Sequence, residues 1–346
     1  MKRRMSAALC VFCCIVLVLS SGMPIFAAEA AEKGEVIVGG SLFGVQMYTE
    51  GVLVVGLDKV TPYDGGATRA PAYDCGIRMK DIITKIDGKA VKDASSVTES
   101  ISKSNGKPIV LTVRRGENEK QFTLTPTKDK DGNFRAGLWI RDTAAGIGTI
   151  TYVDPKTGEF AGLGHGICDG DTGALLPIRR GAVSQVEITG IVKGRKGAPG
   201  ELKGAFSGSK NGALIKNTDS GVYGVFTRIP EALGDRMRLA STNELREGKA
   251  LIRSAVSGCL KDYEVSISKI NKDKNSNKSF VVTVTDKTLL DLTGGVIQGM
   301  SGSPIIQDGK LIGAVTHVMI NDPTTGYGIF IENMLNAANI PMAKAS

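Results

Sequence analysis

Glycine interrupts the apolar stretches of this sequence at short intervals along most of its length. The chain has 44 glycines, and only 5% of its residues are aromatic. Runs such as YEVSISKI and SFVVTVTD alternate apolar and polar residues, as strands with one solvated face do. Because short alternating runs separated by turn residues form hairpins, the pattern favours a mainly β fold over a helical bundle. From Gly146 onward we expect a pair of β-barrels or a sandwich, with GRKGAPGELKGAFSGSKNGA as a basic, glycine-rich loop.

Residues 1–30 have the composition of an export signal. Basic residues 2–4 precede an apolar run that ends near Leu19, and the small-residue pattern Ala28-Glu29-Ala30 follows. The apolar run is short for a bilayer, so it predicts a cleaved signal peptide, with a retained signal anchor as the alternative. In either case we expect the remaining chain to work outside the cytoplasm of the cell that produces it. It would be soluble after cleavage, or anchored in the membrane by this segment.

Charge and cysteine content argue against several classes of protein. The formal net charge is +8, but Lys and Arg are scattered without interleaved aromatic residues. Nucleic-acid binding is therefore not expected, and an anionic membrane surface is a secondary candidate partner. Cys75, Cys168 and Cys259 follow the export segment, and their odd number predicts mostly buried thiols, with a disulfide as the alternative. The sequence contains no metal-binding cluster or phosphate-binding loop, so no cofactor is expected.

Between Val36 and about Ile140 the sequence predicts strands mixed with helices. GVQMYTEGVLVVGL predicts two short strands, and Asp87-Gly88 predicts a hairpin turn. Asp93 is a candidate N-cap for a helix over DASSVTESISKS. We expect a sheet capped by one or two helices in this segment.

This segment resembles a PDZ domain of the bacterial protease-associated type, chiefly in AYDCGIRMKDIITKIDGKAV. The matching residues are Gly76, Ile77, Asp81, Ile83 and Gly88, whereas Lys80 replaces a glycine of the pattern. The resemblance implies a PDZ domain over residues 36–130. It also implies that Phe43, Gly44 and Val45 form the loop that captures a chain end or extended segment by strand addition. The alternative is that the domain only packs against its neighbour.

The stretch GMSGSPIIQDGKLIGAVTH, residues 299–317, places a serine between glycines ahead of a DG turn and an apolar strand. A serine hydroxyl becomes a useful nucleophile when a nearby base takes its proton. The chain has two histidines, and His165 follows a predicted strand between glycines in GLGHGICD. We therefore expect Ser301 to be the nucleophile and His165 the base. Because glycine allows unusual backbone angles, the amides of Gly299 and Ser301 are candidates for an oxyanion hole.

The segment G-x-S-G-x-P resembles the nucleophile region of chymotrypsin-like serine proteases. This resemblance implies a chymotrypsin-like double β-barrel. The order of His165 before Ser301 in the chain agrees with that fold. Met300 stands where trypsin-like enzymes have an aspartate that pairs with a freed amino terminus, so activation by that ion pair is not expected. The resemblance also implies that the strand after the DG turn lines the substrate, through Gly313, Ala314, Val315, Thr316 and His317.

Two longer segments resemble the stage IV sporulation protein B (SpoIVB) peptidase family. They are GLWIRDTAAGIGTITYVDPKTGEFAGLGHGICDGDTG and VTDKTLLDLTGGVIQGMSGSPIIQDGKLIGAVTHVMINDPTTGYGIFIENML. The resemblance implies a serine peptidase domain over residues 136–340 and carries the family's acid onto Asp286. The residues alone leave Asp169 and Asp322 as competing acids, and Asp169 is otherwise a turn former in DGDTG.

The resemblance implies a serine endopeptidase of sporulation signalling, exported into the space between forespore and mother cell. There it is expected to cleave a membrane-bound regulator of an intramembrane metalloprotease, to trigger sigma factor (sigma-K) activation, and to cleave itself. The expected partners are this protein substrate, the chain itself and a membrane surface. The alternatives are an inactive PDZ scaffold and a general quality-control protease of the envelope.

Overall fold

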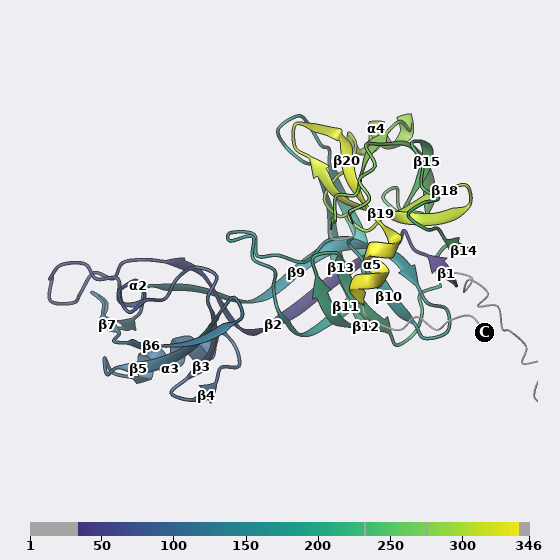
Figure 1. Cartoon of the computed structure of the whole chain (residues 1–346). Coiled ribbons are helices and arrows are strands. Elements are labelled where there is room, and N and C mark those ends of the chain that lie inside the picture. Colours follow the sequence, from purple (N-terminus) through teal and green to yellow (C-terminus); the bar gives the residue numbers. More distant parts are fainter. Residues whose placement is uncertain (1–33, 232, 274–275, 339–346) are drawn as a thin grey trace, which may run out of the picture. The chain divides into compact units, whose positions relative to one another are not determined.

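The computed structural model describes residues 34–231, 233–273 and 276–338 (Figure 1). The expected export segment, residues 1–30, lies outside the described residues. Strands make up most of the described chain, and the helices are short. None of the helices in these ranges is long and apolar enough to cross a membrane.

Six strands close into a first antiparallel barrel. Each pairs with two others, and the ring runs β2, β9, β10, β13, β12, β11 and back to β2. The strands are β2 (Leu42–Leu57), β9 (Leu138–Val153), β10 (Glu159–Gly162), β11 (Ile178–Val192), β12 (Glu201–Thr218) and β13 (Gly221–Phe226). Phe160 packs inside the barrel, with its ring centroid 5.9 Å from that of Phe43 and 4.5 Å from that of Phe226.

A second antiparallel barrel has the same number of strands. Its ring runs β15, β16, β17, β20, β19, β18 and back to β15. The strands are β15 (Gly248–Ser254), β16 (Lys261–Ser268), β17 (Phe280–Val284), β18 (Pro304–Gln307), β19 (Lys310–Met319) and β20 (Asp322–Phe330). Its core holds the neighbouring rings of Phe280 and Phe330. The prediction of a mainly β, double-barrel fold is confirmed.

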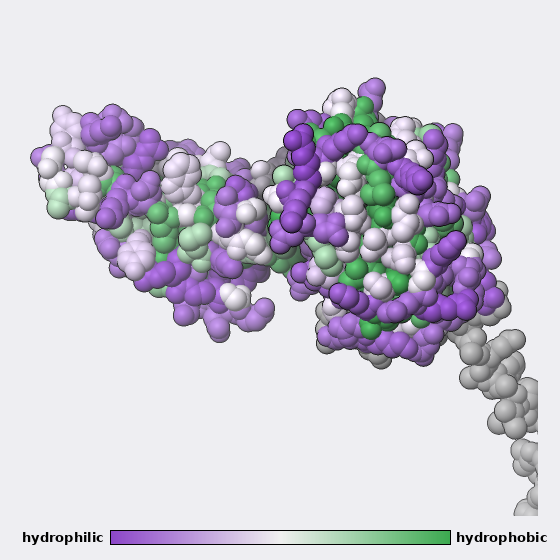
Figure 2. Space-filling model, turned by 90° about the horizontal axis from the view of Figure 1, so that it is seen from above, coloured by the Kyte–Doolittle hydropathy of each residue, from purple (hydrophilic) through white to green (hydrophobic). Residues whose placement is uncertain are grey.

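Short elements complete this part of the chain. β1 (Glu35–Val38) pairs with β9 of the first barrel and with β14 (Arg236–Leu239). β14 in turn pairs in parallel with β19 of the second barrel. Helix α4 (Lys287–Thr293) follows β17, and helix α5 (Ile331–Ala338) follows β20. On the face seen in Figure 2, hydrophilic residues surround an apolar strip on the barrel-bearing part.

The chain between β2 and β9 forms a smaller sheet with helices, as expected. The later half of β2 pairs with β3, β3 pairs with β4 and β5, and β5 pairs with β6. The remaining elements are α2 (Pro71–Asp74), β3 (Ile82–Ile86), β4 (Lys89–Ala90), α3 (Ala94–Lys103), β5 (Ile109–Arg115), β6 (Asn118–Leu124), β7 (Thr127–Lys128) and β8 (Phe134–Arg135). Asp93 caps α3 by accepting from the amide of Ser96. Lys80 has a φ of 71°, the left-handed conformation that the pattern's usual glycine adopts easily.

The structure corrects the expectation for Phe43, Gly44 and Val45. These residues lie in the early half of β2, between β11 and β9 of the first barrel. Phe43 and Val45 are buried in the core of that barrel. Both edges of the strand are hydrogen-bonded here, so no edge is open for a ligand to add as a further strand. The two short strands predicted around Thr49 form one strand, β2, with an irregular register between Tyr48 and Leu53.

Candidate active site

Ser301 lies in the turn that leads into β18 of the second barrel. The flanking Gly299 and Gly302 have φ values of +98° and +92°, which side-chain-bearing residues rarely adopt. A Cβ atom at Gly302 would lie only 2.1 Å from the carbonyl oxygen of Thr149. The glycines are therefore required for a tight turn that is pressed against another strand.

That other strand is β9 of the first barrel, which holds the serine turn through three hydrogen bonds. The amide of Thr149 donates to the carbonyl oxygen of Ser301 at 2.9 Å, and its hydroxyl donates to that of Gly299 at 2.8 Å. The hydroxyl of Thr151 donates to the carbonyl oxygen of Gly302 at 2.8 Å. Both threonines are fully buried, so these bonds join the two barrels at the nucleophile turn without competition from water.

His165 follows β10 of the first barrel. Its Nδ1 lies 2.9 Å from the carbonyl oxygen of Gly166. A carbonyl oxygen only accepts, so this contact assigns the proton to Nδ1 and leaves Nε2 as the basic nitrogen. The imidazole therefore has the tautomer that a general base needs.

The side chain of Asn217, at the end of β12, holds the loop that follows His165. Its Oδ1 accepts from the amide of Ile167 at 2.8 Å. Its Nδ2 donates to the carbonyl oxygens of Ile167 and Leu176, each at 2.9 Å. One side chain thus satisfies three backbone groups of the loop. The sequence analysis missed Asn217, and its place in KNTDSG indicates only a turn.

Ser301 and His165 line one cavity of about 560 Å³, together with His317. The ring centroids of the two histidines are 4.8 Å apart. The hydroxyl of Ser301 donates to the carbonyl oxygen of Thr316 at 2.8 Å, and no hydrogen bond joins it to either imidazole within the described ranges. Rotation of the serine side chain is therefore needed before a proton can pass to a base, as is common in free enzymes.

The amides expected to form an oxyanion hole have no acceptor within the described protein. Gly302 donates its amide to Val315, and Ser303 donates to Met300. The amides of Gly299 and Ser301 make no such bond to any described residue. Two N–H groups in one glycine turn are thus free to bind an anion.

Burial sets the charge state of both imidazoles. It lowers the pKa of His165 below its ordinary value of 6.5, although the Gly166 carbonyl opposes this change. It lowers the pKa of His317 to about 4, and the nearby charges of His165 and Lys278 act in the same direction. Both rings are therefore neutral at neutral pH, and His165 is available as a base.

In the described part of the chain, Asp286 makes no hydrogen bond to His165. Asp286 is the N-cap of α4, where its carboxylate accepts from the amides of Leu289 at 3.0 Å and Glu264 at 3.4 Å. It does not line the cavity that holds Ser301. The expected triad acid is thus occupied in capping a helix, which is a frequent role for aspartate before an apolar helical run.

The two other candidate acids are also engaged elsewhere. Asp169 is buried and forms an ion pair with Arg141, and it accepts from the amide and hydroxyl of Thr172 at 2.8 Å each. This is the turn-forming role that the sequence also suggested. Asp322 accepts from the hydroxyls of Thr324 and Thr325 in its own turn. No carboxylate of the described residues is hydrogen-bonded to His165.

Only the later part of the strand expected to line the substrate reaches the cavity. Gly313, Ala314 and Val315 lie in β19, paired with β18 and β20, and all three are buried. Thr316 and His317 line the cavity. The first three residues are paired on both edges in the second barrel and do not line the cavity, so nothing in the structure supports their expected contact with substrate.

The three cysteines outside residues 1–30 are free thiols, but the expectation of burial is wrong for two of them. Cys168 and Cys259 are exposed, and Cys75 is half-buried. Cys168 lines the cavity with His165, where partial desolvation of its sulfur and the charge of Asp219 raise the pKa of the thiol. A thiol with a raised pKa is a poor nucleophile at neutral pH, so Ser301 remains the candidate.

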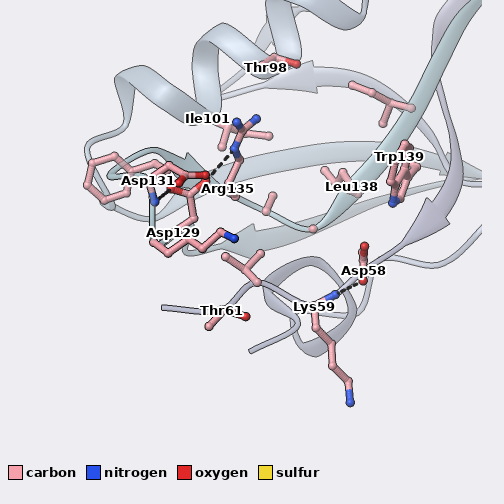
Figure 3. A pocket seen from close by; sticks show the side chains of 16 residues that line it. Asp58, Lys59, Thr61, Thr98, Ile101, Asp129, Asp131, Arg135, Leu138 and Trp139 are labelled. Carbon is pink, nitrogen blue, oxygen red and sulfur yellow. Dashed lines mark hydrogen bonds and ion pairs between the residues drawn. The ribbon is translucent and has the colours of Figure 1, made fainter. Parts of the chain in front are cut away.

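A second cavity, of about 360 Å³, lies beside α3 (Figure 3). It is lined by Thr98 and Ile101 of α3 and by the exposed Trp139 of β9. Figure 3 shows Arg135 directed to Asp129, which it contacts at 3.1 Å. No serine, cysteine or histidine lines this cavity, so it offers none of the side chains that acyl transfer requires.

Comparison with protein families gives two matches. A model described as SpoIVB peptidase S55 matches residues 132–335, which is more than half of the chain. A PDZ domain model matches residues 43–125. The first match contains both Ser301 and His165.

Two curated relatives share only a small part of the chain. A protein named as a zinc metalloprotease from Lactococcus lactis subsp. lactis is 35% identical over 95 residues, 28% of this chain and 21% of that protein. A CtpA-like serine protease from Staphylococcus haemolyticus is 37% identical over 57 residues, 16% of this chain and 12% of that protein. The chain thus spans about a fifth of the length of the first relative and about an eighth of the length of the second.

Solved structures resemble separate parts of the chain. The Rv3671c protease of M. tuberculosis in its active form is 12% identical, covering 59% of this chain and 77% of that one, with a TM-score of 0.35. The thermostable serine protease AL20 from an extremophilic microorganism is 12% identical, covering 58% and 93%, with a TM-score of 0.37. The PDZ domain of an SdrC-like protein from Listeria monocytogenes is 25% identical, covering 26% and 87%, with a TM-score of 0.22.

Proposed function

The chain belongs to the SpoIVB peptidase S55 family and is a serine peptidase with a PDZ domain, and from that premise we propose that it cleaves peptide bonds by acyl transfer through Ser301. The serine oxygen attacks the carbonyl carbon of the scissile bond while Nε2 of His165 takes the hydroxyl proton. The C–N bond then breaks as His165 passes this proton to the leaving amine, and an acyl ester remains on Ser301. Water, deprotonated by the same imidazole, hydrolyses the ester and frees the serine.

One observation carries this proposal. Ser301 and His165 come from different barrels and line the same cavity, beside two backbone amides that have no acceptor in the described protein. The amides of Gly299 and Ser301 would stabilise the oxygen of the tetrahedral intermediate, where negative charge develops. A purely structural glycine turn has no need for this combination.

While the imidazole of His165 transfers the proton, a hydrogen-bond partner must hold the ring in the tautomer with the proton on Nδ1. In this proposal the carbonyl oxygen of Gly166 has that function, because it already accepts from Nδ1 of His165. A carbonyl dipole stabilises an imidazolium less than a carboxylate does, so this arrangement predicts a slower enzyme than one with a complete triad.

We further propose that the substrate is a membrane-bound regulatory protein and that the peptidase acts in sporulation signalling. In this role it is exported into the space between forespore and mother cell, where cleavage of the regulator leads to sigma-K activation. Membership in a family whose model is named for SpoIVB supports this proposal. Self-cleavage near the amino terminus belongs to the same proposal.

Intact mass against time, for the purified wild type beside Ser301→Ala, tests the proposed function. We expect the wild type to shorten and the alanine variant to keep its mass, with the same circular dichroism spectrum. Shortening of both proteins would exclude Ser301 as the nucleophile. If neither shortens and added protein substrates also stay intact, the inactive-scaffold alternative is supported. Broad cleavage of unfolded proteins would instead support a quality-control protease.

A further inference from the structure

The cavity that holds Ser301 has walls without formal charge. Among its lining residues, all from the described part of the chain, none is Asp, Glu, Lys or Arg. The apolar side chains of the wall include Ala144, Ile147, Ile167, Val296, Val318 and Ile320. A volume of about 560 Å³ is large enough to hold several side chains of a bound peptide.

The ionisable groups of the wall are also uncharged at neutral pH. Burial lowers the pKa of His165 and His317, which favours the neutral imidazoles. Burial raises the pKa of the Cys168 thiol, which favours its protonated form. No group on the wall can therefore form an ion pair with a substrate side chain.

Two formal charges that act on groups of the wall lie outside the wall and have opposite signs. Lys278 acts on the pKa of His317, and Asp219 acts on that of Cys168. Neither residue lines the cavity. These two charges have opposite signs, so together they do not favour a cationic over an anionic peptide.

We propose that this cavity selects extended protein segments with small or medium-sized apolar side chains beside the scissile bond, and that it rejects Lys, Arg, Asp and Glu there. A charged side chain would lose hydration in the cavity without meeting an opposite charge. An apolar side chain would gain free energy by leaving water. This inference rests on the proposed function, because it names the substrate class of the same site.

The test is the cleavage of a mixture of synthetic peptides by the purified chain, with products identified by mass spectrometry. We expect bonds beside Ala, Val, Ile or Leu to be cleaved at least about tenfold faster than bonds beside charged residues. Equal cleavage beside charged residues would overturn this inference but leave the peptidase assignment intact. Absence of any cleavage, together with absence of labelling of Ser301 by a serine-directed phosphonate, would overturn both.

A matched pair of variants tests whether the wall itself sets the preference. Ile320 lines the cavity and is 56% exposed, whereas Ile215 lies on β12 away from it and is 55% exposed. Because both side chains already contact water, aspartate at either position should be tolerated by the fold. We expect Ile320→Asp to raise cleavage beside Lys and Arg, relative to apolar residues, at least about tenfold. Ile215→Asp should leave the preference unchanged. An unchanged preference in Ile320→Asp, or an equal change in both variants, would overturn the inference.

Discussion

The two histidines of the chain lie in one cavity, yet their surroundings differ. Nδ1 of His165 has a backbone acceptor, so its Nε2 is free to act as a base. Nδ1 of His317 is buried and has no hydrogen-bond partner in the described residues. Protonation of His317 is therefore costly, which agrees with its pKa of about 4. At the residue scale, these contacts favour His165 over His317 as the proposed base.

Substitution of each histidine by glutamine separates their functions. We expect His165→Gln to lose at least about a thousandfold in kcat/KM, and His317→Gln to lose less than about tenfold. Because only neutral His165 accepts a proton and burial lowers its pKa, activity should persist as the pH falls below 6.5 and disappear at lower pH. Initial rates across the pH range check this expectation. An acid limb centred above 6.5, or a larger loss in His317→Gln, would contradict it.

The three hydrogen bonds of Asn217 predict an effect on catalysis at a distance from the substrate. Asn217→Asp keeps the size of the side chain but removes the two N–H donors, so the loop after His165 should shift. We expect kcat to fall about tenfold to a hundredfold, with a smaller change in KM.

Gln307 provides the control for Asn217. Its side chain accepts from the amide of Arg246 and donates to the carbonyl oxygens of Arg246 and Lys249, away from the cavity. Gln307→Glu should reduce stability, by about 1–3 kcal/mol, without changing kcat per folded molecule. Equal effects of the two substitutions on kcat would show that Asn217 contributes only to stability.

At the element scale, the short helix α4 depends on its cap. Asp286→Ala removes the acceptor for the Leu289 amide and should lower the free energy of unfolding by about 1 kcal/mol. Asp286→Asn keeps an acceptor at the same position, so it should restore most of that stability and retain peptidase activity. Denaturant unfolding and initial rates check both expectations. An asparagine variant with full stability and no activity would show instead that the carboxylate serves His165, as the family resemblance implied.

Local sequence patterns predicted helix caps and turns better than they predicted which distant strands and side chains lie side by side. The cap at Asp93 and the glycine turn at Ser301 depend on residues close in sequence, and the structure has both. The loop expected from GRKGAPGELKGAFSGSKNGA is wrong, because most of it belongs to β12. Several of its glycines lie close to other strands: a Cβ at Gly212 would lie 2.5 Å from the carbonyl oxygen of Val225. This close approach depends on strands that are distant in the sequence, and composition does not show it. Composition alone therefore predicted a loop here.

The same difference between local sequence patterns and long-range contacts applies to the candidate active site. Residue type and local turns led to Ser301 and His165, and the structure places both on the wall of one cavity. Their catalytic functions stay a prediction. The partners of β2 were not predictable in this way, because Gly44 pairs with Ser184 on one side and Ile147 on the other. The function of Asp286 was transferred by resemblance, whereas its position depends on how α4 packs.

At the scale of the whole molecule, the proposed mechanism takes one reacting residue from each of the two barrels. His165 follows a strand of the first barrel and Ser301 precedes a strand of the second. Thr149 and Thr151 join the nucleophile turn to the first barrel by buried hydrogen bonds. A cavity lined by both barrels then holds the serine, the base and two free amides in one place.

The most direct test of this account is labelling of the purified protein by a serine-directed phosphonate, with the modified residue located by peptide mass spectrometry. We predict one adduct, on Ser301, that is absent from Ser301→Ala and strongly reduced in His165→Gln. An adduct on another residue, or undiminished labelling in His165→Gln, would contradict the assignment of Ser301 as a nucleophile activated by His165.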